Sequence, residues 1–238
     1  FNMKHYKEKA QYINKCIDIH ILQPLKNGNP HLYDIVEYAL SGGKRLRSVI
    51  TLTIGECINP SINIDKLALC IEILHNTSLI IDDMPCMDND KYRRGKKTVH
   101  YKYGNRKAQI LVSYLLRNAF KLLQENYIDL INTCNNENSK QNLEDIIFIV
   151  YDTINRNMGF LGAATGQFID TCPMNQLINK DAYKSYYSSV DKLLDLIYLK
   201  TTTFFEIGFL PAYLICIGIE KYTKANEQKM KKMIKYFG

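Results

Sequence analysis

The chain has 238 residues, 46% of them hydrophobic, which is enough for one domain with a sizeable core or at most two small ones. This hydrophobic content excludes an intrinsically disordered protein. A formal net charge of +7 suits anionic partners such as nucleic acid, a membrane surface or phosphorylated metabolites, although a lysine-rich solvated surface would give the same balance. Seven cysteines without a C-x-x-C pair argue against a disulfide framework and a zinc site, and favour a reducing compartment.

Apolar residues recur at helical spacings of three and four along almost the whole chain. The first clear stripe comprises Leu67, Ile71, Leu74, Ser78 and Ile81. The second comprises Leu111, Leu115, Ala119 and Leu122, and the third comprises Ile147, Val150, Ile154 and Met158. Neither a series of alternating strands nor an internal repeat is present in the sequence. We therefore predict an all-α fold, a single-domain large helical bundle.

Other segments have the composition of connections or of a core helix. We predict a basic connection at 92–103 and loops at 132–143 and 171–189. The apolar run at 203–219 is shorter than the roughly 20 residues of a bilayer span, and Glu206 and Pro211 interrupt it, so we predict a buried core helix and no transmembrane segment. No signal peptide is visible, but the chain begins at Phe1 and a targeting segment could have preceded it. We expect an intracellular protein, cytoplasmic or organellar (plastid-like or mitochondrial).

Four carboxylates follow directly on the first apolar helix: Asp82, Asp83, Asp88 and Asp90. Acidic side chains at a helix C-terminus oppose the helix dipole, and when crowded they repel one another. A bound divalent cation would offset both unfavourable interactions. Oxygen ligands without histidine or cysteine suit Mg²⁺ better than zinc or iron. The alternative is a solvated turn.

Basic segments lie on both sides of this acidic cluster. The residues at 93–97 read Arg-Arg-Gly-Lys-Lys, and those at 42–47 read Gly-Gly-Lys-Arg-Leu-Arg. Arginines and a metal ion beside each other are typical of a site for a phosphorylated ligand, and paired glycines let the backbone approach it. The spacing is not that of a nucleotide P-loop, and a surface ion-pair network is the alternative. His75 lies seven residues before Asp82 and so projects from roughly the same helix face, although a structural histidine would also fit.

Together these motifs resemble the trans-polyprenyl diphosphate synthase family. The resemblance rests on 42–47, His75, the run at 82–90 with Pro85-Cys86 inserted between Asp82 and Asp88, and Arg-Arg-Gly-Lys at 93–96. Met158-Gly159, the run at 166–170 and Lys200-Thr201 add to it, and the similarity extends from about Leu40 to the C-terminus. The insertion is similar to that of plant and bacterial geranylgeranyl diphosphate synthases. The resemblance implies a helical fold of the isoprenoid synthase type, a homodimer, and Mg²⁺ or Mn²⁺ as cofactor.

The resemblance also assigns roles to residues of this chain. It implies metal ligands at Asp82 and Asp88, with Asp83 as a further ligand or as support for them. It implies that the allylic diphosphate is held by Arg93, Lys200, Thr201 and Gln167. It implies that isopentenyl diphosphate is held by Lys44, Arg47, His75 and Arg94. The pocket that limits product length is expected at Thr77, Ser78 and Tyr114. The carboxylates Asp82, Asp83 and Asp88 and the cations Arg93 and Lys200 are the expected catalytic residues.

The function implied is Mg²⁺-dependent, head-to-tail condensation of isopentenyl diphosphate with dimethylallyl, geranyl or farnesyl diphosphate, giving geranylgeranyl or farnesyl diphosphate. The alternatives are a non-catalytic partner subunit of such an enzyme and a terpene cyclase or head-to-head condensing enzyme. RNA binding is a more distant alternative, because no recognised module is present, and we expect no nucleic-acid partner.

The sequence departs from the family pattern at several positions. Ser48 stands where the family has proline, Ile81 where it often has histidine, and Ser113 where an aspartate is common. The family's second Asp-rich motif should fall within about two helical turns past Gly238. We therefore expect the natural polypeptide to continue beyond this residue.

Overall fold

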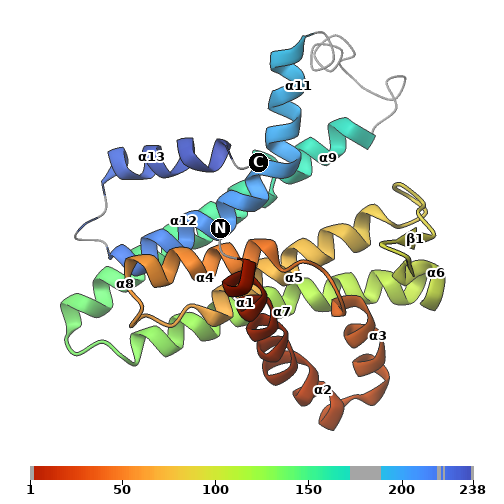
Figure 1. The fold of residues 1–238 in the computed structure, drawn as a ribbon, viewed down its shortest axis with the longest axis horizontal. Helices are drawn as coiled ribbons and strands as arrows, with labels where there is room; N and C mark the ends of the chain where they lie inside the picture. Colours follow the sequence, from red (N-terminus) through yellow and green to blue (C-terminus); the bar gives the residue numbers. More distant parts are fainter. Residues whose placement is uncertain (1–2, 172–188, 219–220, 222, 237–238) are drawn as a thin grey trace. The chain divides into compact units, whose positions relative to one another are not determined.

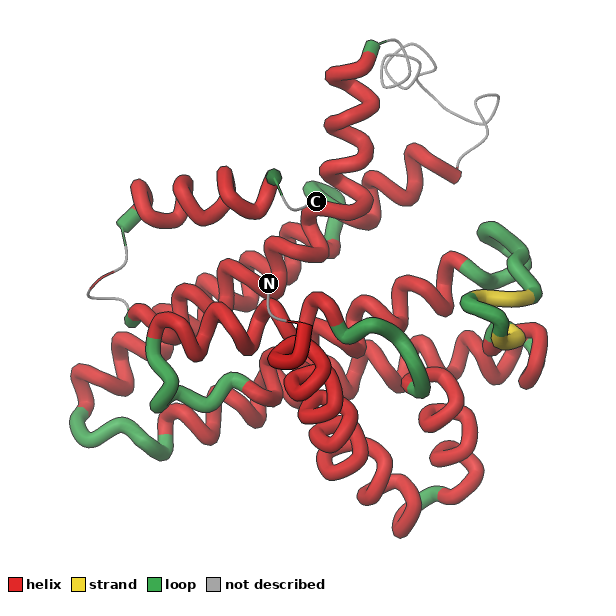
Figure 2. The backbone as a smooth tube through the Cα atoms, in the orientation of Figure 1, coloured by secondary structure: helices red, strands yellow, loops and turns green. Residues whose placement is uncertain are grey.

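The computed structural model describes residues 3–171, 189–218, 221 and 223–236 (Figure 1). Most of these residues lie in helices, and the strands among them are a single antiparallel pair of two residues each (Figure 2). The predicted all-α fold class is confirmed. The loop expected at 171–189 falls almost entirely outside the described residues.

The chain divides into two compact units. The first consists of Phe1–Thr53 and Asn63–Asn132, and the second of Ile54–Ile62 and Thr133–Gly238. Each unit is described by itself below, and the single domain expected from the sequence stays a prediction.

The first unit is built around one central helix. Its elements are α1 (Met3–Ile17), the π-helical turn η1 (Asp18–Leu22), α2 (Gln23–Gly28), α3 (Pro30–Leu40), the start of α4 (Leu46–Ile58), α5 (Asp65–Asp82), the strands β1 (Tyr92–Arg93) and β2 (Lys96–Lys97), α6 (Val99–Tyr103) and α7 (Asn105–Ile131). Helix α5 contacts α1, α3 and α7, and β1 pairs antiparallel with β2. The expected basic connection at 92–103 is therefore this hairpin followed by α6.

Helix α5 is buried on all sides over its first turns. Every residue from 67 to 74 is buried, whereas Ser78 and Ile81 remain partly exposed. The one-sided stripe predicted for this helix was thus too narrow, because three helices pack around it. The stripe predicted for α7 is confirmed, since all four of its apolar residues are buried.

The second unit contains a helix that is buried along nearly its whole length. Its described elements are α8 (Glu137–Met158), α9 (Ala163–Thr171), α11 (Val190–Ile197), the π-helical turn η4 (Tyr198–Thr202), α12 (Thr203–Ile217) and α13 (Lys224–Lys235). Helix α12 packs against α8, and its burial confirms the predicted core helix. Within the described part of the chain, no helix combines the length and the apolar character needed to cross a bilayer.

The loop predicted at 132–143 is shorter than expected. Helix α8 begins at Glu137, because the side chain of Asn136 accepts a hydrogen bond from the backbone N–H of Ser139 at 2.8 Å. Asparagine is a favoured N-cap residue, so this polar stretch starts a helix as well as ending a loop.

Candidate active site

The acidic cluster lies at the C-terminal end of α5. The backbone N–H of Asp88 donates to the carbonyl oxygen of Asp82 at 2.9 Å, and that of Asn89 donates to Met84 at 3.0 Å. Asn89 has a φ of 55°, in the left-handed region that asparagine tolerates better than most residues. These bonds close the turn, so the side chains of Asp82 and Asp88 leave the backbone at neighbouring points. Asp82 is partly exposed and Asp88 exposed.

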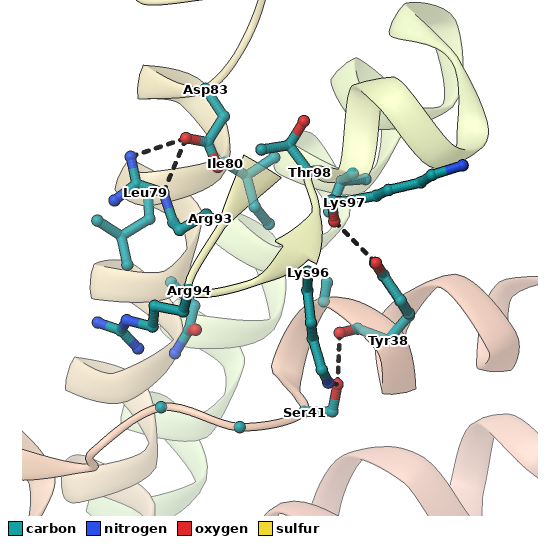
Figure 3. Close-up of a pocket in the computed structure, with 15 residues that line it drawn as sticks. Tyr38, Ser41, Leu79, Ile80, Asp83, Arg93, Arg94, Lys96, Lys97 and Thr98 are labelled. Carbon is teal, nitrogen blue, oxygen red and sulfur yellow. Dashed lines mark hydrogen bonds and ion pairs between the residues drawn. The ribbon is translucent and has the colours of Figure 1, made fainter. Parts of the chain in front are cut away.

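Asp83 is held differently from Asp82 and Asp88. Its side chain is buried, and the Nε and Nη2 atoms of Arg93 both lie 2.7 Å from its Oδ1 atom (Figure 3). The hydrogen bond to Asp83 raises the pKa of Arg93. In this structure Asp83 thus binds the protein's own cation, and its expected part in metal binding, as a further ligand or as support for Asp82 and Asp88, stays a prediction.

The carboxylates fit a hard cation only in combination with further oxygen ligands. Among the residues that the structure describes, no group of three or more His, Cys, Asp or Glu side chains is arranged to hold a metal ion. Mg²⁺ is commonly bound by one or two carboxylates together with the phosphates of a substrate. Asp82 and Asp88 would supply such a pair, and their oxygen-only chemistry also suits Mn²⁺.

The glycine-rich segment before α4 contains three residues in the left-handed region of backbone conformation. Gly42 and Gly43 have φ values of 80° and 88°, and Arg45 has a φ of 54°. A Cβ atom on Gly43 would lie 3.3 Å from Nη1 of Arg45 and 3.4 Å from Nη1 of Arg94, so this glycine allows the two arginines to approach the backbone. Lys44 is exposed, whereas Arg45 is buried and points inward.

Arg47 and His75 form a pair between α4 and α5. Their Nη1 and Nε2 atoms lie 3.2 Å apart. Because a guanidinium has only donors, Nε2 must accept, which makes His75 neutral with its proton on Nδ1. Burial and the positive charge of Arg47 lower the pKa of His75 to about 4. The positive charge of this pair therefore resides on Arg47.

A pocket of about 220 Å³ opens between the β1–β2 hairpin, α3 and α5 (Figure 3). Its lining includes the polar side chains of Asn76, Arg93, Arg94 and Lys96 and the backbone of Gly42 and Gly43. Leu79, Ile80 and Val99 add apolar side chains to the lining. The hydroxyl of Tyr38 donates to the Lys97 carbonyl at 2.7 Å and Nζ of Lys96 donates to Ser41 Oγ at 2.9 Å, so these bonds hold the hairpin against the end of α3. The pocket thus combines cations with a small apolar wall.

The remaining predicted binding residues lie together in the second unit. Lys200 lies in the π-helical turn η4 and forms an ion pair with Asp170 of α9. Gln167 on α9 and Thr201 on η4 are partly exposed, and α9 contacts η4. A Cβ atom on Gly166 would lie 2.8 Å from the backbone nitrogen of Lys200, so the two backbones approach closely here. π-Helical turns are frequent at functional sites.

The residues expected to limit product length lie on α5 and α7, which pack together. Thr77 is buried and its hydroxyl donates to the Ile73 carbonyl at 2.7 Å. Ser78 is partly exposed and donates to the His75 carbonyl at 2.9 Å, and Tyr114 is also partly exposed. Ser78 is therefore the more accessible of the two α5 positions.

The buried carboxylate of Glu72 was not among the predicted site residues. It accepts hydrogen bonds from Arg45 at 2.9 Å and from Ser48 at 2.5 Å. A single charge inside the apolar run 67–74 was the available signal, since a buried charge requires a partner.

Comparison with known proteins gives a consistent result. A family model described as polyprenyl synthetase matches residues 29–238. The chain is 38% identical over 130 residues to geranylgeranyl pyrophosphate synthase 4 of Arabidopsis thaliana, covering 52% of this chain and 34% of that protein. It is 31% identical over 183 residues to a farnesyl diphosphate synthase of Buchnera aphidicola, covering 76% of this chain and 56% of that protein. The chain thus spans between a third and just over half of the length of these relatives.

Solved structures share the fold. A crystal structure of an FPP/GFPP synthase from Zymomonas mobilis matches 98% of this chain and 75% of its own, with a TM-score of 0.73 and 24% identity. A geranyltransferase from Helicobacter pylori matches 99% of this chain and 75% of its own, with a TM-score of 0.72 and 24% identity. The expected type of helical fold is therefore confirmed.

Proposed function

Because this chain belongs to the polyprenyl synthetase family, we propose that it is a prenyltransferase that condenses isopentenyl diphosphate head to tail with an allylic diphosphate. The observation that carries the proposal is the closed turn that brings Asp82 and Asp88 together at the end of α5, beside Arg93. Two carboxylates and an anchored guanidinium are the groups that a metal-bound diphosphate requires.

We assign the allylic diphosphate to the groups around this turn. Asp82 and Asp88 would hold Mg²⁺, or Mn²⁺, and Asp83 keeps Arg93 in place for the diphosphate oxygens. The family resemblance implies that Lys200, Thr201 and Gln167 also bind the allylic diphosphate. When bound, Mg²⁺ would supply positive charge that offsets the charge of the leaving diphosphate.

We assign the second diphosphate, that of isopentenyl diphosphate, to Lys44, Arg47, His75 and Arg94. Lys44, Arg47 and Arg94 provide positive charge, while neutral His75 can donate one hydrogen bond through Nδ1. Gly43 leaves room for the arginines beside the backbone.

The chemistry requires the allylic carbon–oxygen bond to ionise, after which the carbocation must meet the alkene before it meets water. Cations preorganised around the departing diphosphate lower the barrier, and a dry apolar site excludes water. The packed apolar residues of α5 and α7 offer such surroundings for the hydrocarbon tail. The departing diphosphate is a suitable acceptor for the final proton.

We further propose a product longer than fifteen carbons, most simply geranylgeranyl diphosphate. The small side chains of Thr77 and Ser78 support this length, because neither places a bulky group at the level one turn before Asp82. Farnesyl diphosphate is the alternative, and Tyr114 would then set the limit.

We also propose that the protein is a homodimer, as the family resemblance implies. Light scattering of the purified protein would measure its oligomeric state.

The test is incubation of the purified protein with labelled isopentenyl diphosphate, dimethylallyl diphosphate and Mg²⁺, followed by product sizing. Regular five-carbon extension supports the proposal. A cyclised hydrocarbon or a head-to-head product would refute it. Condensation that needs a second, different subunit would identify a partner subunit instead.

A further inference from the structure

The buried carboxylate of Glu72 lies at the centre of a polar network in the first unit. Its Oε1 accepts from Nη1 of Arg45 at 2.9 Å and from Nδ2 of Asn76 at 3.1 Å, and its Oε2 accepts from the Ser48 hydroxyl at 2.5 Å. Burial raises the pKa of Glu72, but the charge of Arg45 and the hydrogen bond from Ser48 outweigh it and keep the pKa below its ordinary value. The charged carboxylate of Glu72 is thus buried and surrounded by hydrogen-bond donors from neighbouring residues.

The network holds Arg45 in an unusual backbone conformation. Arg45 has a φ of 54°, which side-chain-bearing residues rarely adopt, and it lies between Lys44 and Arg47. Besides Glu72, its guanidinium binds Asn14 Oδ1 at 2.9 Å and the carbonyl oxygen of Leu40. The side chain of Arg45 therefore binds groups of the protein itself. Its backbone conformation sets the direction in which the chain presents Lys44 and Arg47.

Two bridges join the first turn of α4 to the middle of α5. Ser48 bonds to Glu72, and the preceding residue, Arg47, bonds to His75. Glu72 and His75 lie three residues apart on α5 and so on neighbouring positions of one face. The Ser48–Glu72 bridge consequently fixes the register in which Arg47 meets His75.

We propose that Glu72 and Ser48 are positioning residues for the diphosphate site at Arg47 and His75. This inference rests on the proposed function. The Glu72 charge offsets the repulsion between Arg47 and Arg94, and the Ser48 hydroxyl couples α4 to that charge. Where the family has proline, this chain therefore has a hydroxyl that helps to orient Arg47.

The test compares Ser48→Ala and Glu72→Gln with Thr53→Val, which removes a hydroxyl of the same helix that donates to the Val49 carbonyl at 2.7 Å. The probe in a first assay is inorganic diphosphate, titrated calorimetrically against the full protein. We expect Ser48→Ala to weaken binding about tenfold, as for a lost hydrogen bond to a charged group, and Glu72→Gln to weaken it further. Thr53→Val should bind like the wild type.

A second assay separates positioning from general damage. In steady-state condensation, Ser48→Ala should raise the KM for isopentenyl diphosphate about tenfold, while the KM for the allylic substrate changes less than twofold. Equal increases in both KM values, or wild-type affinity for diphosphate in Ser48→Ala, would overturn the proposal even if Glu72→Gln fails to fold. A wild-type protein that binds diphosphate without condensing substrates would refute the proposed function and leave the positioning role standing. A wild-type protein that binds no diphosphate would refute both.

Discussion

Both donor atoms of Arg93 that face Asp83 lie 2.7 Å from the same carboxylate oxygen, Oδ1, so one aspartate of the adjacent pair is bound to the protein's own cation. The other, Asp82, is partly exposed at the closed turn with Asp88. Neighbouring residues of identical chemistry therefore have different surroundings, and substitutions at the two should have different consequences.

Replacing Asp82 with asparagine should impair turnover far more than stability. The substitution removes a charge from the expected metal pair but none from the core, so we expect kcat to fall about 10²- to 10³-fold, as when one preorganised electrostatic contact is lost. The melting temperature should change little. The measurements are Mg²⁺-dependent condensation and circular dichroism. Asp34→Asn, at an exposed carboxylate of α3, is the control. Wild-type turnover in Asp82→Asn would show that Asp82 is no metal ligand.

Replacing Asp83 with asparagine should reduce both stability and turnover. The substitution leaves Arg93 without its anionic partner, and we expect a loss of about 1–3 kcal/mol, less than for a fully buried pair because Arg93 is about one-third exposed. The KM for the allylic substrate should rise as Arg93 becomes mobile. Urea denaturation and steady-state kinetics measure the two effects. An unchanged midpoint would mean that the ion pair contributes no net stability.

The neutral state of His75 predicts a specific pH dependence of stability. Its pKa is about 4 in the folded protein against an ordinary value of 6.5, so between these values the unfolded chain binds more protons. The free energy of unfolding should therefore fall as the pH drops from 6.5 to 4. The loss due to His75 should be about 1–2 kcal/mol at pH 5. Denaturant titrations at pH 7.5 and pH 5 measure it.

His75→Gln should remove this contribution, whereas His31→Gln, at an exposed histidine, should leave it in place. The Glu72 carboxylate acts in the same direction but only near and below its ordinary pKa of 4.5, so the pH range above 5 isolates the histidine. An imidazole resonance of His75 that titrates near pH 6.5 would contradict the neutral pair.

Enlarging Ser78 should shorten the product. Burial of each added methylene is favourable by about 0.8 kcal/mol, so chain growth stops only where the cavity is blocked. We expect Ser78→Phe to shorten the main product by at least one isoprene unit while the first condensation continues. Chromatography of the dephosphorylated products gives their lengths.

Tyr114→Ala is the matched change on the facing helix, and it should lengthen the product if Tyr114 is the limit. If the unmodified protein stops at fifteen carbons and Tyr114→Ala lengthens nothing, neither residue controls product length.

Adding a methyl group at Gly166 should disturb the Lys200 turn. The new Cβ would lie 2.8 Å from the Lys200 backbone nitrogen and 3.0 Å from the Leu199 carbonyl carbon, and backbone atoms cannot move aside cheaply. We expect Gly166→Ala to destabilise the protein by about 1–3 kcal/mol, as overpacking does, and to lower turnover. Gly28→Ala, where no atom lies within 4 Å of the new Cβ, should be neutral or slightly stabilising. Urea midpoints of the two variants, if equal, would exclude the close approach.

The sequence by itself determined the helical class and the position of the acidic turn. Periodic apolar residues specify helices because burial requires a continuous face, and this identified α5, α7 and α8, whereas a continuous apolar run identified α12. Motif spacing likewise placed the carboxylates directly after α5, since both the helix end and the turn are local features of the chain.

Only the tertiary structure decided which polar residues are paired with one another. Asp83 pairs with Arg93 ten positions away, Arg45 with Glu72 twenty-seven away, and Ser48 with Glu72 twenty-four away. No local pattern encodes such partners, because Arg93 meets Asp83 only when the β1–β2 hairpin folds against the end of α5, and Arg45 and Ser48 meet Glu72 only when the start of α4 packs beside α5. The same packing buried every residue of α5 from 67 to 74, where the sequence predicted one buried stripe. Whether a charged residue binds ligand or supports its neighbour is thus set by long-range packing, which the spacing of motifs in the sequence does not predict.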